Sequence, residues 1–151
     1  MDIAERLAQH PFCATMAAPV RERLIPCVQA VSFEEGAYLL RQNAPAQTFY
    51  LIEAGRVEIK IAGAATGHAP LETLGAGEAV GWSWFLPPYR WHFDAVARTA
   101  TQTLALDAAC LRGLMDADST VGYVITRGLL DVVAQRLQAA RMQLSDLYRQ
   151  P

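Results

Sequence analysis

The stretch TFYLIEAGRVEIKI, residues 48–61, decides how the middle of the chain folds. An apolar run at residues 49–52 ends at the dipeptide Ala54-Gly55, and apolar and charged residues then alternate from Val57 to Ile61. Alternation with a period of two indicates a half-buried β-strand, and a glycine between two such runs is typical of a tight turn. The stretch therefore predicts a β-hairpin.

Short strands of the same kind are predicted on both sides of this hairpin. Residues 32–42, SFEEGAYLLRQ, predict two strands about a Glu35-Gly36 turn, and residues 62–70, AGAATGHAP, predict a turn that closes another hairpin. A last strand is predicted at residues 99–107, TATQTLALD. Many short strands separated by glycine turns are typical of a closed antiparallel roll, because closure leaves no open sheet edge. We therefore expect a β-roll over residues 31–107.

Helical periodicity is found on either side of the roll. In residues 1–30 apolar residues recur at spacings of three and four and are interrupted by prolines, which predicts several short helices. After the last strand the helical period returns, and Asp116 or Asp118 with Ser119 can cap a long helix that runs to about Tyr148.

These patterns together predict an α+β fold class. The expected architecture is a double-stranded β-helix, or jelly-roll-like β-roll, with short N-terminal helices and a long C-terminal helix. A chain of 151 residues can bury one core but not two comfortable ones, so we expect a single domain over residues 1–151. Its expected segments are a helical N-terminal part (residues 1–30), the β-roll (31–107) and the C-terminal helices (108–148).

The long helix carries a heptad seam. Its members, spaced alternately by three and four residues, are Leu130, Val133, Leu137, Ala140, Leu144 and Leu147. Leu129 and Val132 form a second, shorter stripe, so one stripe can dock on the roll while the other meets a partner helix. We therefore predict a homodimer through this helix; the alternative is that both stripes are buried within one subunit. In a parallel pair Arg136 and Arg141 would face each other with like charge, which predicts a short or splayed contact.

Composition excludes several classes of protein. The chain is 52% hydrophobic and 19% charged, and its net charge of −2 offers no basic footprint for nucleic acid. We find neither a secretory signal nor a membrane-spanning apolar run. The three cysteines, Cys13, Cys27 and Cys110, are odd in number and widely spaced, which predicts free thiols and a cytoplasmic location.

All three tryptophans lie in GWSWFLPPYRW, residues 81–91. One hypothesis is that this stretch binds a small ligand with an apolar or flat part, with Arg90 receiving an acidic group and Ser83 completing an anion site. The expected ligand residues are Gly81, Trp82, Ser83, Trp84, Arg90, Trp91 and His92. The alternative hypothesis is that the tryptophans fill the roll and leave no pocket.

The order of elements resembles the cyclic-nucleotide-binding domain of the catabolite activator protein and nitrogen-fixation regulator (Crp/Fnr) family. The resemblance is carried by LAQHPF (residues 7–12), VSFEEGAYLLRQNAPAQTFYLIEAGRVEIKI (31–61), LETLGAGEAVGW (71–82) and TATQTLALDAACLRGLM (99–115), with glycines at positions 36, 55, 77 and 81. It covers nearly the whole chain and implies a regulatory, ligand-binding β-roll.

The family resemblance also implies a phosphate-binding cassette that this chain alters. In the family a Gly-Glu pair, a short helix and an arginine hold the ribose and phosphate of the nucleotide. Gly81 matches the glycine, but Trp82 stands at the glutamate position and Trp91 at the arginine position, between Arg90 and His92. The ligand is therefore expected to be a cyclic nucleotide only if Arg90 or His92 takes over the missing role, or otherwise another small anionic or aromatic molecule.

Two functions follow from these observations. The first is a non-enzymatic small-ligand sensor that passes its signal to the long helix, and the second is a ligand-free dimeric scaffold or protein-interaction module. The histidines are not spaced as a metal pair and no acid, base or nucleophile pattern occurs, so we predict no catalytic residues and no metal. No helix-turn-helix segment follows the long helix before Pro151, which predicts no DNA binding by this chain itself.

Overall fold

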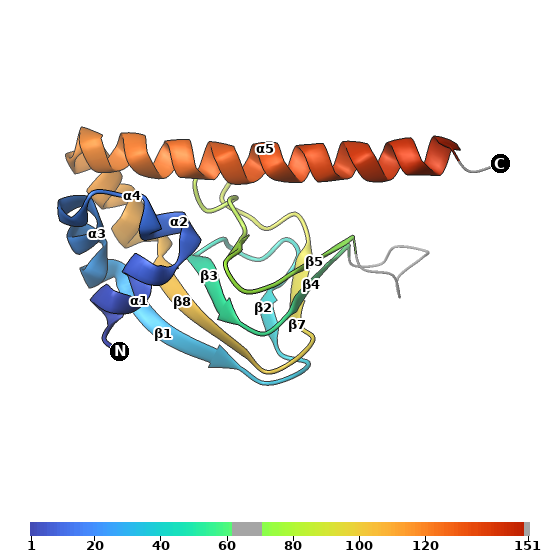
Figure 1. Cartoon of the computed structure of the whole chain (residues 1–151), viewed down its shortest axis with the longest axis horizontal. Coiled ribbons are helices and arrows are strands. Elements are labelled where there is room, and N and C mark those ends of the chain that lie inside the picture. The colour runs from blue at the N-terminus through green and yellow to red at the C-terminus, as the bar shows by residue number, and fades with distance from the viewer. Residues whose placement is uncertain (62–70, 150–151) are drawn as a thin grey trace.

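The computed structural model describes residues 1–61 and 71–149 as a β-roll covered at one end by short helices and along one side by a long helix (Figure 1). The strands form two four-stranded antiparallel sheets. One sheet has the order β1 (Val28–Phe33), β8 (Thr101–Asp107), β3 (Thr48–Ala54) and β6 (Ala79–Val80), and the other has the order β2 (Tyr38–Leu40), β7 (Asp94–Ala97), β4 (Val57–Lys60) and β5 (Glu72–Leu74). The predicted α+β class and β-roll are confirmed. That residues 1–151 form one domain stays a prediction.

The helices match the predicted order. The N-terminal part contains α1 (Ile3–Gln9), α2 (Pro11–Ala14), α3 (Ala18–Leu24) and the 3-10 turn η1 (Ile25–Cys27). A proline occupies the first or second position of α2, α3 and η1, where its missing N–H costs no hydrogen bond. These helices and α4 (Ala108–Ala117) lie beneath the N-terminal end of α5 (Ser119–Arg149), which extends across the roll (Figure 1).

The predicted hairpin at Gly55 is wrong. β3 pairs with β8 and β6, whereas β4 pairs with β5 and β7, so the chain crosses from one sheet to the other at this turn. Gly55 has a φ of +102°, and a Cβ there would lie 2.5 Å from the carbonyl oxygen of Ala100, so only glycine fits. The alternation of apolar and charged residues indicates a strand with one buried side, but it does not indicate which other strand pairs with this strand. The predicted pairing of β4 with β5 is confirmed, and its connecting turn lies outside the described residues.

The two stripes of α5 differ in burial. Val121, Ile125 and Leu129 are buried in the hydrophobic core, where α5 contacts α4 and α3, and Val132 packs against this core. The leucines of the heptad seam face away, with Leu130 67% exposed, Leu137 50%, Leu144 53% and Leu147 66%. Ala140 is exposed at the edge of the seam, and Val133 is half-buried. The alternative that one subunit buries both stripes is therefore wrong. Among the described residues, no helix is both long and apolar enough to cross a membrane.

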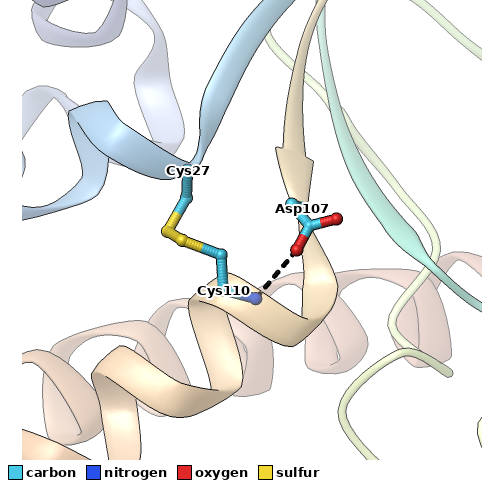
Figure 2. The surroundings of a disulfide bond; sticks show 3 residues. All are labelled: Cys27, Asp107 and Cys110. Carbon is cyan, nitrogen blue, oxygen red and sulfur yellow. Dashed lines mark hydrogen bonds between the residues drawn. A yellow bond between two sulfur atoms is a disulfide. The ribbon is translucent and has the colours of Figure 1, made fainter.

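The prediction of three free thiols is wrong for two of the cysteines. Cys27, at the end of η1, is bonded to Cys110 in the first turn of α4 (Figure 2). Pairing of β1 with β8 places Val28 opposite Leu106, which brings the two cysteines to a Cα–Cα distance of 5.6 Å although 83 residues separate them. Spacing along the sequence could not reveal this proximity, because the strand register creates it. Cys13 is a free, buried thiol.

A buried histidine joins the N-terminal helices to the roll. His10 is 4% exposed; its Nδ1 accepts a hydrogen bond from the Phe12 N–H at 3.2 Å, and its Nε2 lies 3.0 Å from the carbonyl oxygen of Ile52. Since a carbonyl oxygen only accepts, Nε2 carries the proton and the neutral ring satisfies both partners. Burial lowers the pKa of His10 below its ordinary value of 6.5, although hydrogen bonding to the backbone of Ile52, the charge of Glu53 and the backbone of Glu78 each raise it.

We expect the free energy of unfolding to decrease as the pH falls below about 6.5, because the unfolded chain then binds a proton at His10 that the folded chain binds less readily. The contribution of His10 to the free energy of unfolding is fully present above the pKa of His10 in the unfolded chain. It is lost as the pH falls toward the lower pKa of His10 in the folded chain. Urea unfolding between about pH 5 and pH 7.5 measures it, and His10→Gln should flatten the dependence. His92→Gln, at an exposed site, is the matched control; equal slopes for the His10 variant and the wild type would contradict this account.

Candidate ligand site

The segment between β6 and β7, residues 81–93, contains turns and no helix. The Phe85 N–H donates to the carbonyl oxygen of Trp82 at 3.0 Å, and the Tyr89 N–H donates to that of Leu86 at 2.9 Å. The family cassette uses the N-terminal amides of a short helix to receive phosphate. This segment, which we call the cassette segment, offers no such helix end.

Two of the three tryptophans belong to the core. Trp84 is 0% exposed and packs on Phe49 with ring centroids 5.2 Å apart, and Trp91 is 4% exposed. Gly81 has a φ of +82°, and a Cβ there would lie only 2.4 Å from Cζ3 of Trp91. The indole of Trp91 therefore lies directly on the glycine that the family places beside its ligand. Of Arg90, Trp91 and His92, it is Trp91 that points inward.

The other residues expected at an anion site do not meet. Arg90 is exposed and its Nη1 donates to the carbonyl oxygen of Asn43 at 2.8 Å. His92 is also exposed, whereas Ser83 is buried. Because these side chains diverge, the cassette segment has no cluster of donors that could receive an anion.

Trp82 has a different position and lines a cavity. This cavity has a volume of about 250 Å³ and lies between the roll and α5. Its lining residues are Ile59, Leu71, Glu72, Trp82, Phe93, Arg136, Ala139, Ala140 and Gln143. The rings of Trp82 and Phe93 meet edge to face with centroids 6.4 Å apart. A second cavity of about 550 Å³ adjoins it between α5, α2 and the turn before β6, and the two share Glu72, Arg136, Ala139 and Gln143.

Arg136 is the charged residue at the centre of these cavities. Its guanidinium lies 5.2 Å from the centroid of the Trp82 ring, donates to the carbonyl oxygen of Ala79, and has Nε 3.3 Å from a carboxylate oxygen of Glu72. Only 13% of its side chain is exposed, and burial lowers the pKa of the guanidinium while Glu72 opposes this effect. The paired charges of Arg136 and Glu72 leave a largely apolar, aromatic pocket with little net charge.

Sequence reasoning missed Arg136 as a pocket residue and assigned it to the flank of the heptad seam. A signal was present, because Leu129, Val132 and Arg136 follow one another at spacings of three and four. The stripe that α5 turns toward the core therefore continues into Arg136. An arginine within an otherwise apolar docking stripe indicates a buried partner.

A second arginine holds the cassette segment from α4. The Nη1 atom of Arg112 donates to the carbonyl oxygen of Trp84 at 2.6 Å, and its guanidinium lies 4.5 Å from the centroid of the Tyr89 ring. Arg112 and Arg136 thus connect the cassette segment with α4 and α5. In the described part of the chain, no group of three or more His, Cys, Asp or Glu side chains is arranged to hold a metal ion.

We expect Gly81→Ala to destabilise the protein more than Gly36→Ala. Both glycines have a positive φ, which costs an alanine about 1–2 kcal/mol, but Gly36 faces open space whereas Gly81 faces Trp91. The collision should add about 1–3 kcal/mol to the loss at Gly81. Urea unfolding measures both variants, and equal losses would show that Trp91 does not press on Gly81.

Comparisons with known proteins agree with this fold. A model of the family described as the cyclic nucleotide-binding domain matches residues 30–118, which is more than half of the chain. Comparison with curated protein sequences gave no match.

Three solved structures illustrate the similarity. A putative cyclic nucleotide-binding protein from Geobacter metallireducens GS-15 has a TM-score of 0.81 at 22% identity, over 91% of this chain and 99% of that chain. The catabolite activator protein of Thermus thermophilus has a TM-score of 0.69 at 24% identity, over 91% and 63%. The regulatory subunit of a cAMP-independent protein kinase A from Trypanosoma brucei has a TM-score of 0.68 at 21% identity, over 95% and 49%.

At these identities the solved structures establish a shared fold, and the family model establishes kinship in sequence. The predicted resemblance to the sensor domains of Crp/Fnr regulators is confirmed. This chain belongs to the cyclic nucleotide-binding domain family.

Proposed function

We propose that this domain is a non-enzymatic regulatory module that does not bind cyclic nucleotides in the manner of its family. The observation that carries the proposal is the contact of the buried Trp91 indole with Gly81. An anion at that position would have to displace an aromatic ring from the core, and Arg90 is turned away from it. Losing charge-assisted hydrogen bonds of roughly 1.5–3 kcal/mol each leaves a phosphate without compensation for its desolvation.

The ligand pocket of this module is the cavity between Trp82, Phe93 and α5. Its aromatic walls and the mutual neutralisation of Arg136 and Glu72 favour a small, flat molecule without net charge. Ala139 and Ala140 of α5 form one wall of the cavity, so that a bound molecule contacts both the roll and the long helix. The signal of binding is thereby passed to α5.

The runner-up function is a ligand-free scaffold. It is favoured by the burial of Trp84 and Trp91, which pack in the core and would leave less room for a ligand. The fold has a relative described as belonging to a cAMP-independent kinase, which supports a domain that works without cyclic nucleotide. We also propose a cytoplasmic location, because regulators of this family are typically cytoplasmic. The cysteines no longer support this location, since Cys27 and Cys110 are bonded to each other.

We further propose that two copies of the chain pair through the seam of α5. A row of half-exposed to exposed leucines at heptad spacing, led by Leu130, Leu137 and Leu144, is an unpartnered apolar face that a second copy would cover. The like-charge opposition of Arg136 and Arg141 is removed, because Arg136 turns to the roll and pairs with Glu72. A parallel pair is therefore compatible with the charges beside the seam.

Cyclic AMP and cyclic GMP should produce no saturable change in tryptophan fluorescence or melting temperature up to about 1 mM. All three indoles lie in the cassette segment, so binding there would be visible. The double variant Trp82→Glu, Trp91→Arg restores the two side chains that the family uses. If only this variant responds to the nucleotides, residues 82 and 91 account for the lack of nucleotide binding by the wild type. Saturable micromolar binding by the wild type would overturn the proposal.

Uncharged aromatic probes such as indole and naphthalene test the pocket itself. We expect them to raise the melting temperature of the wild type and to have no effect on Ala139→Trp, whose new ring would fill the shared wall of both cavities. Gln138→Trp, on the same helix but outside both linings, is the matched control. If no probe stabilises the wild type, the scaffold function is the better account.

The dimer is tested by Leu137→Glu, which should convert the protein to a monomer of 16.5 kDa in light scattering. Two unpaired carboxylates in an apolar seam should weaken association by roughly 100-fold or more. Gln138→Glu adds the same charge one residue away from the seam and should remain dimeric. A wild-type protein that is already monomeric would refute pairing through α5.

A further inference from the structure

The disulfide between Cys27 and Cys110 is the covalent link between the N-terminal helices and the helices that follow the roll (Figure 2). Cys27 ends η1, and Cys110 lies in the first turn of α4, where the Asp107 carboxylate accepts the hydrogen bond of its backbone N–H at 2.9 Å. A second, weaker link runs alongside, since Arg23 of α3 pairs with Asp118 before α5 at 2.6 Å. Both links hold the segment that joins the roll to the long helix.

The position of α4 affects how firmly the cassette segment is held, because Arg112 of this helix contacts the segment. Arg112 lies two residues after Cys110 and holds Trp84 and Tyr89. When the disulfide is closed, the first turn of α4 is tied to η1 and Arg112 is held in place. When it is open, α4 is retained by non-covalent contacts alone, and we expect the hold of Arg112 on the cassette segment to loosen.

The two ends of the disulfide differ in access. Cys27 is 5% exposed, whereas Cys110 is an exposed residue. Cys110 is therefore the end of the bond that a small thiol or disulfide can reach from solvent. Cys13 offers the contrast, because burial raises the pKa of its thiol to about 12 and keeps it protonated.

We propose that Cys27 and Cys110 form a reversible thiol–disulfide pair that exchanges with low-molecular-weight disulfides and controls how firmly α4 holds the cassette segment. In the oxidising direction the Cys110 thiolate attacks one sulfur of the small disulfide, whose S–S bond breaks and releases one thiolate. The Cys27 thiol then loses its proton and attacks the Cys110 sulfur, which releases the second thiolate. The protein loses two electrons and two protons, and the small disulfide becomes two thiols.

This pair explains how a chain expected in a reducing compartment can contain two bonded cysteines. It predicts two states of one fold, with the same strands and helices but a different tightness of α4. The closed state should melt roughly 5–15 °C above the open state, because the bond closes a long loop. Amide exchange in residues 108–117 should be faster in the open state.

The first experiment equilibrates the native full chain in buffers of reduced and oxidised glutathione, quenches exchange with acid, and counts free thiols by alkylation under denaturing conditions and mass spectrometry. We expect a single transition between one free thiol, that of Cys13, and three. A pair that stays reduced in excess oxidised glutathione overturns the proposal. A pair that stays bonded in excess reduced glutathione does so as well, since it would then be a permanent link.

The second experiment tests the effect on α4. The open wild type should resemble Cys110→Ser and Cys27→Ser in melting temperature, in amide exchange of residues 108–117 and in tryptophan fluorescence. Cys13→Ser, which keeps the pair, should still respond to glutathione and is the matched control. If the oxidised wild type and the two pair-breaking variants show the same exchange in α4, the bond does not control that helix.

Discussion

Cζ3 of Trp91 lies within 2.4 Å of the position that a side chain on Gly81 would occupy, and the site of this domain is arranged around that contact. In the family, the residue at the place of Trp91 is an arginine that meets a phosphate, as the resemblance implies. An indole there replaces a charged donor by a large apolar ring, whose burial is favourable. Arg90 and His92, on either side of the buried Trp91, are exposed.

With tryptophan at position 91, where the family has arginine, the candidate ligand site lies beside α5. With Trp84 and Trp91 buried, the cavity that we propose as the ligand pocket lies where Trp82 and Phe93 line it beside the long helix. Arg136 takes part in three interactions there, with Trp82, Glu72 and Ala79, and Arg112 holds the other end of the cassette segment from α4. A buried guanidinium needs such partners, because an unpaired charge in this surrounding would be costly. The cassette segment is therefore held by the helices on which a regulatory signal would act.

Sequence reasoning recovered the fold with few errors. Periods of two and of three to four residues placed the strands and helices, and they separated the heptad seam of α5, predicted to meet a partner helix, from a second, shorter stripe. The prediction of a hairpin at Gly55 was wrong, because alternation along one strand does not identify the strand with which it pairs. The prediction of three free thiols was wrong for two of them, because only the register of β1 with β8 brings Cys27 close to Cys110. That residues 81–92 bind a ligand stays a prediction, and the directions of their side chains could not be read from their spacing in a segment of turns.

The sequence by itself determined the β-roll, the long helix with two stripes, and the absence of the two charged anchors from their family positions. These are properties of local periodicity and residue identity, which do not depend on what lies far away in the chain. Only the tertiary structure decided that Trp91 faces inward, that Arg136 belongs to the pocket, and that Cys27 meets Cys110. Each of these depends on segments distant in sequence that the closed roll and the docked α5 bring together, and no local pattern records such a meeting.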